Sequence, residues 1–97
     1  KTINVDITPL NIVVNVPNSR DGVPIESYKR DDPTLNARLI AKLQGALAGR
    51  TGDEARIVAV LCKDEAAPYY LWMDVTDAIE QAGGIITLVR EEVVNVQ

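Results

Sequence analysis

Two adjacent carboxylates, Asp64 and Glu65, are the residues best suited to chemistry, because they closely follow the apolar run of residues 58–62. Acids at the carboxyl end of a strand are common in α/β active sites. The chain has no histidine, however, which excludes a Ser-His-Asp triad, a Cys-His pair and the usual zinc sites. Acids just before a helix are otherwise explained by capping and by the helix dipole. We therefore expect no enzyme activity, no cofactor and no metal site.

Three aromatic side chains, Tyr69, Tyr70 and Trp72, fall within one turn of a predicted helix. Amphipathic aromatic residues dominate many protein interfaces, so this cluster is a candidate contact surface. Packing against the core is the alternative for each of them. Tyr69 begins the helix. Tyr70 and Trp72 flank the apolar stripe and are candidate partner-binding residues.

The glycine pairs and the cysteine offer no further chemistry. Gly83 and Gly84 follow a helix instead of linking a strand to a helix N-terminus, so they predict a helix end and not a phosphate loop. Residues 49–52 also lack the Gly-Lys-Ser/Thr pattern of such a loop. Cys62 is the one cysteine of the chain, which excludes an internal disulfide, and we expect it to be a small buried side chain.

Charge limits the possible partners. The net charge of −4 argues against nucleic acid, because phosphate binding needs a basic patch. The one local basic pair, Lys29-Arg30, is followed at once by Asp31-Asp32, which predicts a solvated turn.

Length and hydropathy indicate one small domain. The 97 residues, of which 46% are hydrophobic, are sufficient for a single core. No apolar run approaches the ~20 residues that span a bilayer, and there is no signal peptide. Because the chain begins with Lys1 instead of Met, we expect it to be a piece of a longer protein.

The first part of the chain predicts short strands. Residues 10–16 alternate and form a half-buried strand whose buried face carries Leu10, Ile12, Val14 and Val16. Turn-forming residues follow, and residues 23–28 then predict a strand that Pro24 makes edge-like. Residues 1–9 also alternate in part, so they are either an extra strand or an extended segment before a domain of residues 10–97.

Two amphipathic helices follow. The first is expected to begin at Asp32-Pro33 and end at Gly49, and its leucines recur every fourth residue at positions 35, 39, 43 and 47. A polar loop then precedes a strand that starts at Ala55 or Arg56. The second helix is expected to open at Pro68 and to bury Leu71, Val75, Ala78, Ile79 and Ala82.

Another apolar strand, Ile85–Val89, comes directly after the second helix. A helix between two apolar strands is typical of a crossover connection. We therefore predict a two-layer α+β fold, in which two helices pack on one face of a mixed four- to five-stranded sheet.

The second half of the chain resembles the periplasmic domain of the ExbD/TolR biopolymer transport family. The resemblance covers residues 10–89 and is carried by residues 64–89, at Asp64, Tyr69, Val75, Ile79, Ala82-Gly83 and Ile85–Val89. The residues around Pro68 and the second glycine, Gly84, depart from the family pattern. The resemblance implies the same two-layer fold. It also implies that Tyr69, which matches the family tyrosine at the helix start, lies in the core or at its border, and that an extended segment at residues 1–9 would be membrane-proximal.

The resemblance also implies a function. Members of the family are accessory subunits of proton-driven motors in the Gram-negative inner membrane, each with one transmembrane helix and a small domain in the periplasm. The expected partners are an ExbB/TolQ-like membrane subunit, reached through that helix, and a TonB- or TolA-like protein. We also expect a homodimer, and contact with peptidoglycan, proposed for some relatives, stays open.

Strand addition at a sheet edge is the expected mode of partner binding, because backbone hydrogen bonds give affinity and alternate side chains give selectivity. The candidate partner-binding residues are Ile85, Ile86, Thr87, Leu88, Val89, Val93, Val94, Val96, Tyr70 and Trp72. The alternative hypothesis is a regulatory module that binds a small molecule. Its pocket would lie between the loops near Asp64 and Gly52, with polar contacts from Asp53, Glu54 and Glu65.

Overall fold

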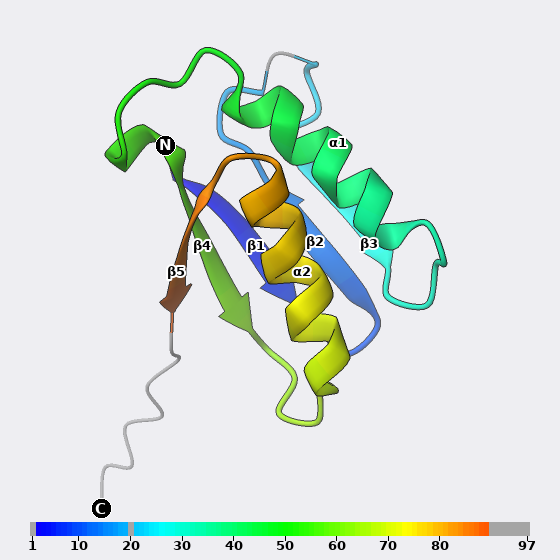
Figure 1. Ribbon diagram of the computed structural model, residues 1–97. Helices are drawn as coiled ribbons and strands as arrows, with labels where there is room; N and C mark the ends of the chain where they lie inside the picture. Colours follow the sequence, from blue (N-terminus) through cyan, green and yellow to red (C-terminus); the bar gives the residue numbers. More distant parts are fainter. Residues whose placement is uncertain (1, 20, 90–97) are drawn as a thin grey trace, which may run out of the picture.

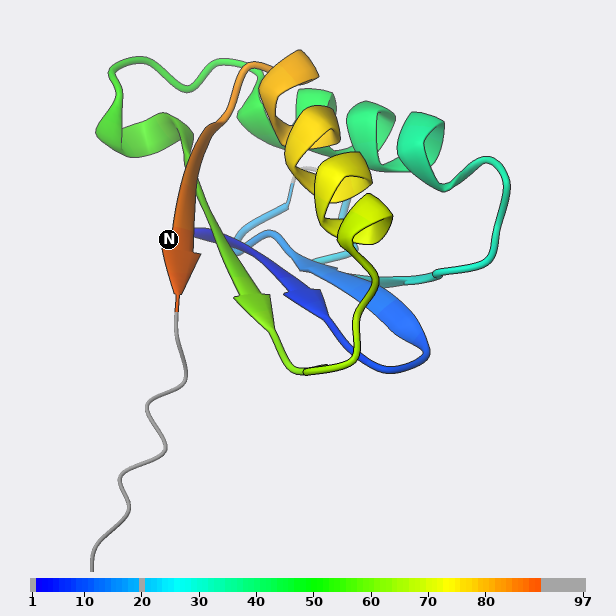
Figure 2. The same ribbon diagram turned by 60° about the horizontal axis from the view of Figure 1, so that its bottom comes forward.

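The computed structural model describes residues 2–19 and 21–89. Its strands form one mixed sheet, and both helices lie on the same face of it (Figures 1 and 2). The strands are β1 (Ile3–Ile7), β2 (Asn11–Asn15), β3 (Ile25–Lys29), β4 (Ile57–Cys62) and β5 (Ile85–Val89). The helices are α1 (Leu35–Leu47) and α2 (Tyr69–Gln81), and a short 3₁₀ turn, η1 (Glu54–Arg56), precedes β4. The predicted two-layer α+β fold is confirmed.

The sheet has the strand order β3-β2-β1-β4-β5. Antiparallel pairs join β1 to β2 and β2 to β3, whereas β4 lies parallel to both β1 and β5. Of the two states expected for residues 1–9, the structure shows a strand. This strand, β1, is the centre of the sheet, and β3 and β5 are its two edges.

The core fills the space between the sheet and the helices. Alternate residues of the strands point into it, so β1 buries Ile3, Val5 and Ile7 completely. The predicted apolar stripes of both helices meet these side chains. The remaining core residues are Ile12, Val14, Val16, Tyr28, Leu35, Leu39, Leu43, Leu47, Val58, Val60, Leu71, Val75, Ala78, Ile79 and Ala82.

Leu10 is not in the core, contrary to the prediction, since 79% of it is exposed. The cause is a tight turn before β2. The Thr8 backbone N–H and hydroxyl both donate to the Asn11 carbonyl, each at 2.9 Å, and the Asn11 N–H donates to the Thr8 hydroxyl. The strand therefore begins at Asn11, and the side chain of Leu10 points out of the turn.

Other element starts also differ from prediction, and the strand expected over residues 23–28 is Ile25–Lys29. Asp32 does not begin α1: its carboxylate accepts bonds from the Thr34 N–H at 2.8 Å and from the Thr34 hydroxyl, and the helix starts at Leu35. These bonds hold the pKa of Asp32 below its usual range. The strand expected from Ala55 or Arg56 begins at Ile57, because those two residues belong to η1.

The turn from α2 into β5 depends on its two glycines. Gly83 has φ +89°, in the left-handed region that suits a helix end, and a Cβ there would collide with the guanidinium of Arg56. Arg56 donates from Nε to the Gly83 carbonyl at 2.8 Å. At Gly84 a Cβ would lie 2.9 Å from Ile79 Cγ2. The predicted helix end is confirmed, and this turn fixes where β5 begins.

Candidate partner-binding edge

The outer side of β5 is the barest strand edge in the described part of the chain. Among the described strands β5 pairs only with β4, so its other side presents backbone N–H and C=O groups that none of these strands bonds. Three of its five side chains are exposed apolar groups: Ile85 at 39%, Leu88 at 61% and Val89 at 45%. The strand contains no charge and no proline, two common means of protecting an edge.

The side chains of β5 alternate between the two faces of the sheet. Ile86 packs against the core, so it and Leu88 point to the face that the helices cover. Ile85, Thr87 and Val89 point to the opposite, uncovered face.

On that uncovered face the residues beside β5 are also apolar. The register places Ile57, Ala59 and Leu61 of β4 next to Ile85, Thr87 and Val89. The next strand is polar there, and an ion pair between Lys63 Nζ and Asp6 Oδ2 at 3.2 Å lies at the border. An apolar surface therefore runs from the uncovered face of β4 onto the edge of β5.

Trp72 lies on the β5 side of α2. It packs partly buried against the core. Two residues along a helix correspond to a rotation of about 200°, so Trp72 and Asp74 take opposite flanks. The Asp74 carbonyl accepts a bond at 3.1 Å from Asn36 of α1, which places the Asp74 flank toward α1 and the Trp72 flank away from it, toward β5 (Figure 1).

Tyr70 belongs to a different place. It is 67% exposed and lines a groove at the end of the sheet where β1 turns into β2. The other residues of this groove are Pro9, Leu10, Asn11, Lys29, Arg30 and Asp31. The structure thus separates Tyr70 from the candidate residues of β5, whereas Trp72 stays near them.

Tyr69 is not in the core or at its border, since 76% of it is exposed. The helical phase explains this result. Leu71 and Val75 are buried and set the inward direction of α2, and Tyr69 lies two residues before Leu71, on the outer side of the helix. A position at the start of a helix does not show whether the side chain faces the core or the solvent.

Asp64 has a structural role. Its Oδ2 accepts a bond from Arg30 Nη1 at 2.6 Å, and the same nitrogen donates to the carbonyls of Thr8 and Pro9, each at 2.9 Å. The bond from Arg30 holds the pKa of Asp64 below its usual range. This cluster joins the β1–β2 turn, the end of β3 and the loop after β4. Glu65 is exposed and takes no part in an ion pair of the described residues.

The single pocket of the alternative hypothesis does not form. Gly52, Asp53 and Glu54 lie in a groove before β4, together with Pro17 and Arg50. Asp64 and Glu65 come after the other end of that strand, a distance of about 20 Å for six residues. The two predicted halves of the pocket are therefore at opposite ends of the sheet.

Several other expectations concern single features. Cys62 is half-buried, not buried, and its thiol donates to the Asp64 carbonyl at 3.1 Å. No cluster of possible metal ligands occurs in residues 2–19 and 21–89. Neither helix of that part of the chain has the length and apolar character needed to cross a membrane. The candidate residues Val93, Val94 and Val96 lie outside the described residues.

Fold and edge together define, over the described residues, a small two-layer α+β domain with a bare edge at β5. Comparison of the chain with protein-family models, with curated proteins and with solved structures found no match.

Proposed function

We propose that this chain is the periplasmic domain of an accessory subunit of a proton-driven inner-membrane motor of the ExbD/TolR kind. In this proposal the domain works as a homodimer, binds an extended segment of a TonB- or TolA-like protein, and performs no catalysis. A membrane helix elsewhere in the protein would join it to an ExbB/TolQ-like subunit. The motor would drive outer-membrane transport or envelope maintenance.

The observation that carries the proposal is the bare apolar edge of β5. An added strand would form backbone hydrogen bonds along Ile85–Val89 and bury the exposed Leu88 and Val89. Monomeric proteins usually protect such edges with charge, proline or a covering loop. An edge without these devices in the described chain is explained by a partner that covers it.

The order of the elements agrees with the resemblance found in the sequence. A β2–β3 hairpin precedes α1, and β4, α2 and β5 form the crossover that carries the family-like residues. Asp64 supports the proposal differently: its ion pair with Arg30 accounts for a carboxylate at this position without catalysis.

The test is an NMR titration of the labelled domain with peptides that tile the periplasmic linker of a TonB- or TolA-like protein from the same organism. We expect shifts in the amides of β5 and in the indole of Trp72. Thr87→Lys, at the centre of β5, should abolish these shifts, because an edge lysine opposes strand addition.

Ser27→Lys is the matched control, since Ser27 is the exposed centre of the other edge strand, β3. It should leave binding unchanged. The absence of any shift at about millimolar peptide, with the domain and its variants folded, would contradict the proposal. A Kd of about 1 mM corresponds to a binding free energy of only about 4 kcal/mol, so weaker binding would have no functional meaning. Shifts that map to β3 would contradict it equally.

A further inference from the structure

The charges of this chain are distributed unequally along the sequence. Residues 1–63 contain nine Lys and Arg and seven Asp and Glu. Residues 64–97 contain one basic residue, Arg90, and seven acidic ones. The acidity of the protein therefore belongs to the part that contains α2 and β5, the strand of the candidate edge.

The acidic side chains of α2 face solvent. Asp74, Asp77 and Glu80 are all exposed, and the helix has no basic residue. None of these three forms an ion pair in the described part of the chain, where the paired acids are Asp6, Asp21, Glu26, Asp32 and Asp64. α2 packs against β5. Asp74 lies on the flank toward α1, whereas Asp77 and Glu80, each two residues after a buried residue, lie on the outer side of the helix and supply the negative charge near the bare edge.

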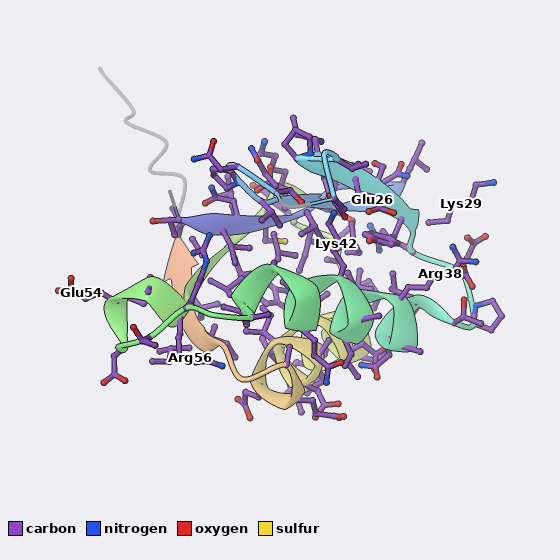
Figure 3. All side chains as sticks on the ribbon, turned by 90° about the horizontal axis from the view of Figure 1, so that it is seen from above. Glu26, Lys29, Arg38, Lys42, Glu54 and Arg56 are labelled. Carbon is purple, nitrogen blue, oxygen red and sulfur yellow. The ribbon has the colours of Figure 1, made fainter. Side chains whose placement is uncertain are left out.

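The nearest basic residues among the described ones, Lys63 and Arg56, cancel only part of this charge. Lys63 is paired with Asp6. Arg56 donates to the carbonyls of Arg50 and Gly83, so its single positive charge lies at the turn before β5 and offsets only part of the acidity. Glu54 is exposed next to Arg56, and its side chain points away from the domain (Figure 3).

The edge itself is uncharged and apolar on both faces. An added strand would lie beside Ile85, Thr87 and Val89 on the uncovered face, and beside Ile86 and Leu88 on the helix face. Its central residues would therefore be apolar or β-branched at successive positions. Charge can act only through residues on either side of that centre.

We infer that the segment captured at β5 is an apolar stretch of about five residues flanked on both sides by lysine or arginine. This inference rests on the proposed function and specifies its partner. The acidic surface of α2 attracts the basic flanks, which raises the association rate and orients the segment toward β5. β3 carries both an acid and a base, Glu26 and Lys29, so it does not offer the segment the same attraction.

Two synthetic peptides test the inference. Both have the same centre of alternating valine and threonine, and the flanks are two lysines on each side in one peptide and two glutamates in the other. Binding is followed by the shifts of the β5 amides. At about 0.01 M salt, where charges act over about 30 Å, we expect the lysine peptide to bind at least about tenfold more tightly. The difference should shrink at about 0.15 M salt.

A pair of variants locates the attraction. Glu80→Gln removes one exposed charge from α2 and should weaken the lysine peptide about twofold at low salt. Asp31→Asn removes one exposed charge beside β3 and should have no effect.

The possible results separate the two claims. Equal binding of both peptides at β5, or a larger effect of Asp31→Asn, would overturn the charge inference and leave strand capture intact. Failure of both peptides to bind at either salt concentration would overturn strand capture itself.

Discussion

The two edges of this sheet differ in how they are protected. β3 carries Glu26 and Lys29, and Pro24 lies just before it. α1 adds Lys42, whose amine donates to the Val23 carbonyl at 3.0 Å and pairs with Asp21 at 2.9 Å and with Glu26 at 3.2 Å (Figure 3). β5 has none of these features. Within the described residues, the same sheet therefore has one edge protected by charge and one edge without such protection.

The difference shows that protection is a local property of each edge strand. Both strands have five residues and one neighbour. Three of the five residues of β3 are polar, whereas four of the five residues of β5 are apolar. Nothing in the topology requires this, so the side chains alone decide which edge is available.

The largest expected effect comes from the turns that lead to the two edges. Gly83→Ala should cost about 3 kcal/mol of unfolding free energy, because a positive φ combines with the collision with Arg56. Gly22→Ala, in the loop before β3, has φ +75° and open space around it, so it should cost about 1 kcal/mol. Urea unfolding measures both. Equal losses would mean that Arg56 does not hold the turn before β5.

Removal of Lys42 should come next. Lys42→Met keeps the apolar stem and removes the bonds to Val23, Asp21 and Glu26, at a cost of about 1 to 2 kcal/mol. Hydrogen exchange should then become faster in β3 and stay unchanged in β5. Faster exchange at both edges would show that Lys42 supports the whole sheet. Lys63→Met, which removes an exposed lysine with one partner, is the control.

Acid should weaken the β3 side through Asp64. Its pKa is depressed in the folded state by Arg30, so its contribution is fully present above the unfolded pKa of about 3.9 and is lost as pH falls through the lower folded value. Asp64→Asn should lower the unfolding free energy at pH 7. At about pH 3 the difference in unfolding free energy between the variant and wild type should be smaller. Urea unfolding at both pH values measures this. A constant difference would show that the Arg30 pair adds no pH dependence.

The smallest effect on folding should come from an apolar substitution at each edge. Thr87→Ile and Ser27→Ile both alter an exposed position and should change stability by no more than about 0.5 kcal/mol. Thr87→Ile should nevertheless increase self-association, because it extends the apolar edge, whereas Ser27→Ile should not. Sedimentation of the two variants gives the comparison. Equal self-association would remove the distinction between the edges.

Periodic patterns predicted most of the fold. The leucine spacing of α1, the stripe of α2 and the glycines after it were sufficient for both helices, and alternation was sufficient for β2. The place of β1 was not predictable, because pairing with both β2 and β4 is a tertiary choice that alternation leaves open. Leu10 was misplaced because a turn stabilised by the Thr8 hydroxyl interrupts an otherwise regular pattern.

The candidate site was predictable only in part. An apolar run after a crossover helix indicated β5, but only the strand order shows that β5 is an edge. Tyr70 and Trp72 are close in sequence, and the helical rotation between them sends one to the groove at Leu10 and the other toward β5. The protection of β3 could not be predicted from the sequence, because Lys42 lies on a helix and pairs with Glu26 of a strand that precedes it in the chain.

The central position of β1 also has a consequence for biogenesis. β1 is made before the other strands, and β2 follows within a few residues, but Val58, the partner of Ile3 on the other side, is made much later. At a synthesis rate of about 5 to 20 residues per second, that side of β1 waits about 3 to 10 seconds for β4. The edge of β1 that pairs with β4 in the folded domain is thus without its partner strand for longest on the ribosome. Chaperone contact during translation should concentrate there, on the segment Ile3–Ile7.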